Sequence, residues 1–87
     1  MAQFQASTHV EDGMLTLKLD NQIVLQNSDS TSFDIRDHQE YVVQWFVVGR
    51  PGSMYSITIS SPIEAQFQLS RSLKASGKDY GGFRFNA

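Results

Sequence analysis

The chain contains no cysteine, and this absence removes two means of stabilising a small protein. Disulfides and thiolate metal sites both require cysteine, so stability has to come from packing and from hydrogen bonds between strands. A chain of 87 residues buries only about 60 to 65 % of the surface that it exposes when unfolded. We therefore predict a single small domain over residues 1–87, in which every core residue matters.

Basic residues are few, and long apolar runs are missing. Seven Lys and Arg stand against nine Asp and Glu, which gives a net charge of −2. Nucleic acid and anionic membranes are bound by clustered cations, so we expect neither as the main partner. No run approaches the roughly 18 apolar residues of a membrane span, and the first ten residues, MAQFQASTHV, show no targeting signal. We expect no membrane insertion, and the compartment stays open because exported proteins can also lack disulfides.

The charges are distributed unevenly along the chain. Residues 1–40 contain seven acidic and two basic residues, whereas residues 41–87 contain five basic and two acidic ones. Acidic and basic strands that interleave in one fold would account for this pattern, and we favour that interpretation. The alternative is a polarised surface that steers a partner.

What the sequence has in abundance is period-two alternation, which is typical of strands with one buried and one hydrated face. Residues 3–10 and 14–20 alternate cleanly, and Asp20-Asn21 tolerates the positive φ of a tight hairpin turn before QIVLQ. Seven or eight short strands and no long helix predict an all-β protein, a single small antiparallel β-sandwich with immunoglobulin-like or jelly-roll-like architecture. The predicted inward positions are Phe4, Ala6, Thr8, Val10, Leu15, Leu17, Leu19, Tyr55, Ile57, Ile59, Ile63, Ala65, Phe67, Leu69, Phe83 and Phe85. Phe33 and Ile35 predict a short strand within the polar segment 27–40.

The segment GRPGS predicts a second tight turn. Pro51 presets φ for the first central position, and Gly52 supplies the positive φ that a type II turn needs at the second. We therefore predict that residues 41–48 and 54–60 pair as an antiparallel hairpin within one sheet.

Residues for chemistry are scarce, so we predict no catalytic residue, metal site or cofactor. His9 and His38 lie in separate elements, and no His-x-His or Gly-x-Ser-x-Gly spacing occurs. Asp29, Asp34 and Asp37 could supply oxygen ligands to calcium, but they lack the spacing of an EF-hand loop. We interpret them as hydrated loop carboxylates.

The segment 41–48 departs from the alternation because both of its faces are largely apolar. One face holds Tyr41, Val43, Trp45 and Val47, and the other holds Val42, Gln44, Phe46 and Val48. Three coverings of the second face are open: a loop of the same chain from residues 27–40 or 70–82, a partner protein or second copy, or a ligand such as a carbohydrate.

From this segment we predict a non-enzymatic interaction module that binds a protein partner or itself through the sheet containing residues 41–60. The alternative is a carbohydrate-binding module that uses aromatic residues and polar loops, with Trp45, Tyr41, Tyr55 and Tyr80 as the aromatic candidates. The predicted binding residues are Tyr41, Gln44, Trp45, Phe46, Val48 and Tyr55.

Overall fold

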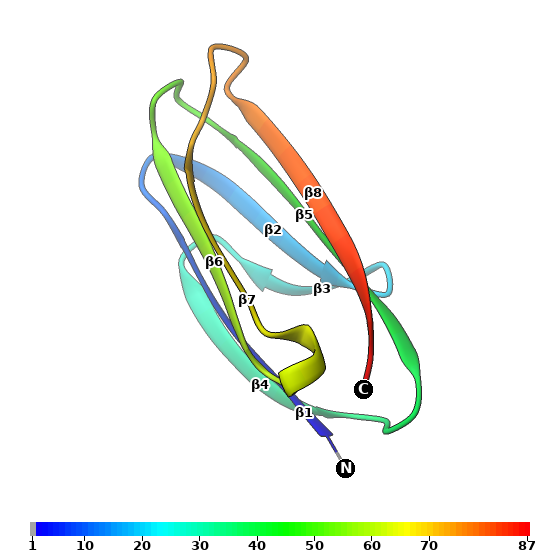
Figure 1. Ribbon diagram of the computed structural model, residues 1–87. Helices are drawn as coiled ribbons and strands as arrows, with labels where there is room; N and C mark the ends of the chain where they lie inside the picture. The colour runs from blue at the N-terminus through cyan, green and yellow to red at the C-terminus, as the bar shows by residue number, and fades with distance from the viewer. Residues whose placement is uncertain (1) are drawn as a thin grey trace.

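The structure, a computed structural model, describes residues 2–87 and consists almost entirely of strands (Figure 1). One short 3₁₀ turn, η1 (Ile63–Ala65), interrupts them. The strands are β1 (Ala2–Val10), β2 (Gly13–Leu19), β3 (Gln22–Gln26), β4 (Asp29–Ile35), β5 (Glu40–Gly49), β6 (Met54–Ser61), β7 (Phe67–Ser72) and β8 (Lys78–Asn86). Within residues 2–87, no helix is long and apolar enough to cross a membrane.

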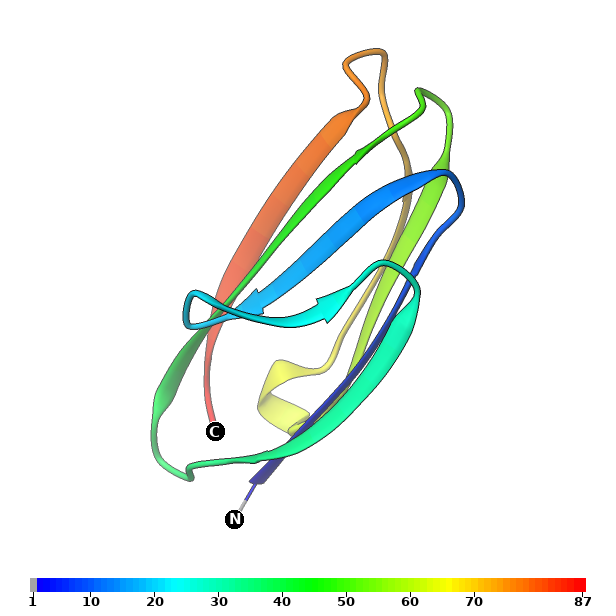
Figure 2. The same cartoon turned by 180° about the vertical axis from the view of Figure 1, so that it is seen from behind.

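The eight strands form two antiparallel four-stranded sheets that pack face to face, so the predicted antiparallel β-sandwich is confirmed. We call them the β1 sheet, with strand order β4-β1-β6-β7, and the β5 sheet, with strand order β3-β2-β5-β8. The molecule is elongated, 40 Å by 19 Å by 19 Å, and both chain ends lie at the same end of it (Figure 1). The view from behind shows the short turn that leads from β3 of the β5 sheet to β4 of the β1 sheet (Figure 2).

The core lies between the sheets and is built from the alternate residues of each strand, as the pattern predicts. Phe4, Leu15, Leu17 and Ile57 are almost fully buried. The ring of Phe85 stacks on those of Phe4 and Tyr41, with centroids 6.4 Å and 5.5 Å apart. The predicted short strand around Phe33 and Ile35 is the longer strand β4, which pairs with β1. One apolar layer therefore holds both sheets together.

The turn between β2 and β3 has the predicted conformation. Asp20 and Asn21 have φ of 50° and 66°, as expected of the two central residues in a hairpin turn whose twist matches its strands. The Asp20 carboxylate also accepts the backbone N–H of Val42 at 2.8 Å. The hairpin is thereby anchored to β5 as well as closed on itself.

The second predicted turn is correct, but the predicted pairing is wrong. Gly52 has φ of 89°, and the N–H of Ser53 donates to the carbonyl of Arg50 at 3.0 Å. Nevertheless β5 pairs with β2 and β8, and β6 pairs with β1 and β7, so residues 41–60 are divided between the two sheets. The turn is a crossover between the sheets. Its backbone forms hydrogen bonds with the β7–β8 loop: the N–H of Gly49 donates to the carbonyl of Gly77, and the N–H of Gly52 donates to the carbonyl of Leu73, both at 2.8 Å.

The predicted inward position of Ile63 is also wrong. Ile63 begins the 3₁₀ turn and is 74 % exposed, and regular pairing resumes only at Phe67. Pro62 precedes it and has no backbone N–H to donate to a ladder, so the alternation cannot run unbroken from β6 into β7. Ala65, at the end of the turn, is buried as predicted.

Candidate functional site

Strand β5 has one buried face and one that the chain leaves partly open. Tyr41, Val43, Trp45 and Val47 point into the sandwich, whereas Phe46 is 48 % and Val48 53 % exposed. Val42 and Gln44 are partly buried. Of the three coverings left open, a loop of the same chain does not cover Phe46 and Val48, because residues 27–40 and 70–82 supply Phe33, Ile35 and Leu73 to the core instead.

The neighbouring strands extend the apolar surface on the outer side of β5. Register places Met14 and Thr16 of β2 opposite Val48 and Phe46, and it places Tyr80 of β8 opposite Phe46 on the other side. The Phe46 and Tyr80 rings stack with centroids 6.4 Å apart. Met14 is 68 % and Tyr80 75 % exposed. We call this surface the outer patch and define it as Met14, Val42, Phe46, Val48 and Tyr80.

A shallow groove crosses the outer patch above Gly82. It has a volume of about 410 Å³ and lies between Phe46 and Tyr80 on one side and Val42 and Arg84 on the other. Gly82 pairs with Gln44 and brings no side chain to fill the space. A Cβ at Gly82 would lie 2.5 Å from the carbonyl oxygen of Val43, so glycine is required where β8 approaches β5 this closely.

Basic side chains border the outer patch. The ammonium group of Lys18 lies 5.7 Å from the centre of the Phe46 ring, within the range of a cation–π contact. Lys78 pairs with Val48, and Arg84 pairs with Val42. Arg84 also lies 3.7 Å from the carboxylate of Glu40, and both side chains are exposed. Three cations and two carboxylates, Glu40 and the Asp20 group that accepts the N–H of Val42, therefore surround the patch. The patch border is positive, although the chain as a whole has a net charge of −2.

The predicted binding residues divide into two groups, one on the outer face of the β5 sheet and one in the core between the two sheets. Gln44, Phe46 and Val48 lie on the outer side of β5, where a partner can reach them. Tyr41, Trp45 and Tyr55 are buried between the sheets, with relative exposures of 7 %, 6 % and 1 %. Of the four aromatic candidates, Tyr80 alone is largely exposed, so the four rings do not form one aromatic surface.

Trp45 lies on the core side of β5, beneath the outer patch, and its packing explains why Gly81 is a glycine. A Cβ at Gly81 would lie 2.5 Å from Cζ2 of Trp45, so the indole occupies the space that a side chain on β8 would need. The Trp45 ring also contacts Phe67 and Phe83 at centroid distances of 5.3 Å and 6.4 Å. Its Nε1 is buried without a hydrogen-bond acceptor. These contacts make Trp45 a core residue.

Tyr55 forms a polar contact between the two sheets. Its hydroxyl donates to Oδ2 of Asp79 on β8 at 2.5 Å, and Arg71 of β7 lies 3.9 Å from the same carboxylate oxygen. Burial of the phenol and the hydrogen bond to the carboxylate raise the pKa of Tyr55 to about 12. Both causes favour the protonated tyrosine. Burial would deprive the phenolate of hydration, and ionisation would place a second negative charge beside Asp79.

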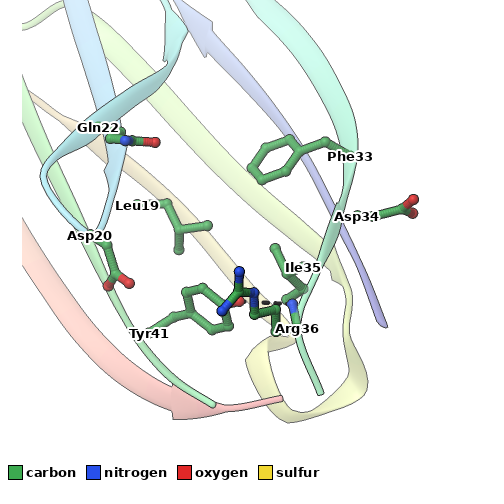
Figure 3. Close-up of a pocket in the computed structure, with 8 residues that line it drawn as sticks. All are labelled: Leu19, Asp20, Gln22, Phe33, Asp34, Ile35, Arg36 and Tyr41. Carbon is green, nitrogen blue, oxygen red and sulfur yellow. Dashed lines mark hydrogen bonds between the residues drawn. The ribbon is translucent and has the colours of Figure 1, made fainter. Parts of the chain in front are cut away.

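A second cavity lies at one end of the sandwich, where the β2–β3 turn faces β4 (Figure 3). We call it the end pocket. Its volume is about 480 Å³, and Leu19 and Phe33 lie on opposite sides of it. The Tyr41 hydroxyl accepts the backbone N–H of Arg36 at 2.8 Å, and the Arg36 side chain folds in front of the Tyr41 ring (Figure 3). Asp34 points away from the other side chains (Figure 3).

Side chains that could bind a metal ion do not converge in the part of the chain that the structure describes. No cluster of three or more His, Cys, Asp and Glu side chains there is arranged to hold a metal ion. His9 is exposed, with its Nδ1 3.4 Å from the hydroxyl of Ser28. His38 lies in the β4–β5 loop with φ of 57°.

Comparison of the chain with models of protein families, with curated proteins and with solved structures gives no match. The function therefore has to be argued from the residues of the outer patch and the end pocket.

Proposed function

We propose that the protein is a non-enzymatic interaction module that binds a protein partner through the outer face of the β5 sheet. The observation that carries this proposal is the outer patch, in which the side chains of Met14, Val48, Phe46 and Tyr80 are exposed and adjacent by register on three neighbouring strands, with the partly buried Val42 further along β5. Contiguous exposed apolar surface on a small protein usually marks a site of interaction. Because residues 41–60 are divided between the sheets, the proposed surface includes β5 and excludes β6.

The outer patch also has the composition of a binding surface. Phe46, Tyr80 and Met14 are residue types that are enriched at protein interfaces, and Tyr80 combines apolar area with a polar hydroxyl. The groove above Gly82 gives a partner a recess for an anchoring side chain, and Gln44 is the polar side chain of β5 in its lining.

Selection of binders from a random peptide-display library tests this proposal. We expect the wild-type chain to select peptides whose binding is weakened about tenfold or more by Phe46→Thr, since a central aromatic anchor contributes that much or more. Met54→Thr is the matched control, because Met54 is 47 % exposed on the other sheet and Phe46 is 48 % exposed. Light scattering over a concentration series shows in parallel whether a second copy occupies the face.

The proposal fails if no selected peptide depends on Phe46 and the chain stays monomeric at all concentrations. It fails equally if the two variants weaken binding to the same extent.

The end pocket supports carbohydrate binding as a second candidate function. Asp20, Gln22 and Arg36 surround an apolar wall that includes Phe33 and the ring of Tyr41. Planar polar groups beside apolar surface suit the hydroxyl groups and the C–H faces of a sugar. A glycan array tests this candidate, with Gln22→Ala and Arg36→Ala as variants of exposed side chains. A signal that both variants abolish supports it, and an array without any bound glycan removes it.

A further inference from the structure

We infer that the partner of the outer patch is an acidic segment of extended chain with apolar anchor residues, an inference that rests on the proposed function. The segment would place its anchors on Phe46, Tyr80 and the groove above Gly82, and its carboxylates against Lys18, Lys78 and Arg84.

Charge complementarity is the first argument. Lys18 on β2 lies on one side of β5, and Lys78 and Arg84 on β8 lie on the other side. A chain that runs along β5 would therefore have cations on both flanks. Two carboxylates border the same face: Glu40, which forms an ion pair with Arg84, and Asp20, whose Oδ1 accepts the N–H of Val42. Three cations against two carboxylates leave the face positive, while the chain as a whole is negative. Such a field attracts acidic partners and disfavours basic ones.

The dimensions of the outer patch are the second argument. Along β5 it extends from Val42 to Val48, and across the sheet it covers β2, β5 and β8. With about 3.3 Å per residue and about 4.8 Å between strands, its backbone positions span roughly 20 Å by 10 Å. An extended segment of about six residues has the same length of roughly 20 Å. A folded copy would have to bury about 800 Å² on each partner, and therefore also the charged surface around the patch.

A second copy is also disfavoured by charge. Two of these faces packed against each other would bring two surfaces of the same net sign together, and each copy would have to desolvate Lys18 and Lys78. An acidic segment would instead offer carboxylates to the same cations.

The test uses three sets of fluorescein-labelled eight-residue synthetic peptides. Every peptide contains Phe and Leu as anchors, and the remaining positions are Asp and Glu in the first set, Ser and Gln in the second, and Lys and Arg in the third. Fluorescence anisotropy with the full chain is measured at low and high salt. We expect the acidic set to bind about tenfold or more tighter than the neutral set at low salt, and to lose this advantage at high salt.

Two double variants separate the position of the cations from net charge. Lys18→Ser with Lys78→Ser removes two cations from the outer patch, whereas Ser7→Glu with Ser70→Glu adds two carboxylates to exposed positions of the other sheet. Both pairs change the net charge equally. We expect the first pair to weaken binding of the acidic set about tenfold and the second to change it less than about twofold.

The outcomes distinguish this inference from the proposed function. Equal binding of the acidic and neutral sets, lost on Phe46→Thr, overturns the acidic preference and leaves the binding face standing. A concentration-dependent dimer that Phe46→Thr dissociates replaces the acidic segment with a second copy. Absence of binding by all three sets overturns the inference, and the peptide-display selection then decides separately whether the face binds any partner.

Discussion

The two outer faces of the sandwich have the same architecture and opposite chemistry. On the β1 sheet the outward side chains are mostly Ser, Thr and Gln, with His9, Asp34 and the singly exposed Met54 as exceptions. Several of the polar side chains hydrogen-bond to one another or to the backbone. Gln5 donates to Gln3 at 3.2 Å, and the hydroxyl of Ser61 donates to the carbonyl of Gln3 at 2.7 Å. On the β5 sheet the corresponding positions hold the outer patch and its bordering cations.

The β1 sheet shows that a sheet of this sandwich can form without an apolar outer face. Both sheets bury one face in the same core, and the β1 sheet forms with hydrated polar side chains on its other face. Exposed Phe46, Val48 and Tyr80 gain little from folding because they remain largely in contact with water. Their presence on one face alone is the strongest support for a binding role of that face.

Trp45 and Phe46 are neighbours on β5 that point to opposite sides, so they provide the largest expected contrast. Trp45→Ala should lower the free energy of unfolding by about 3–5 kcal/mol, because it removes a buried ring that contacts Phe67 and Phe83. Urea denaturation followed by circular dichroism measures this. A loss below about 1 kcal/mol would show that the ring is not a core element.

Tyr55→Phe should have the next largest effect, since it removes the hydrogen bond between the two sheets. Loss of the donor to the Asp79 carboxylate should cost about 1–3 kcal/mol. Thermal and urea denaturation at pH 7 measure the loss. The conservative variant keeps the buried ring, so an unchanged stability would mean that the bond contributes nothing net.

The difference in stability between the wild-type chain and Tyr55→Phe should depend on pH. The pKa of Tyr55 is raised from 10.0 to about 12, so the native state keeps a proton that the unfolded chain releases in this range. The stabilising contribution is complete below pH 10 and is lost as the pH rises towards 12. We expect the stability of the wild-type chain to fall more steeply than that of Tyr55→Phe over this interval, and parallel curves would contradict the assignment.

Phe46→Thr tests whether the outer patch is dispensable for folding. Threonine keeps strand propensity, and the ring is half exposed, so we expect a loss of about 1 kcal/mol or less. Met54→Thr on the β1 sheet should cost a similar amount. If the Phe46 variant were destabilised as strongly as Trp45→Ala, the patch would belong to the core and the contrast between the faces would disappear.

Arg84→Ala should have the smallest effect on stability. Its ion pair with Glu40 is solvent-exposed and 3.7 Å long, so we expect a loss of about 0.5 kcal/mol or less that salt abolishes. Denaturation at low and high salt checks this. A large, salt-insensitive loss would indicate that Arg84 has a packing role in the fold.

Much of the core could be predicted from alternation, while the pairing of strands could not. Phe4, Leu15 and Leu17 are inward because side-chain direction is a local property of a strand. The GRPGS turn, by contrast, has the predicted conformation and connects different sheets. The same four-residue turn can close a hairpin or cross between sheets, so its residues do not specify which strands become neighbours.

The candidate site was predictable only in part for the same reason. The double apolar face of β5 identifies Phe46 and Val48 from sequence. Met14, Lys18, Tyr80 and Arg84 join them through the register of β2 and β8, and these strands lie more than twenty residues away on either side. No local pattern in the sequence marks them as members of one surface.

The sequence by itself determined the all-β class, the inward side chains of most strands and the conformation of the two tight turns. Each follows from alternation and from the φ preferences of a few residues, which act over short distances along the chain. Only the tertiary structure decided that β5 lies between β2 and β8 and that the second face of β5 stays open. Backbone hydrogen bonds between strands do not depend on side-chain identity, so strand order is set by how the whole chain buries its apolar residues.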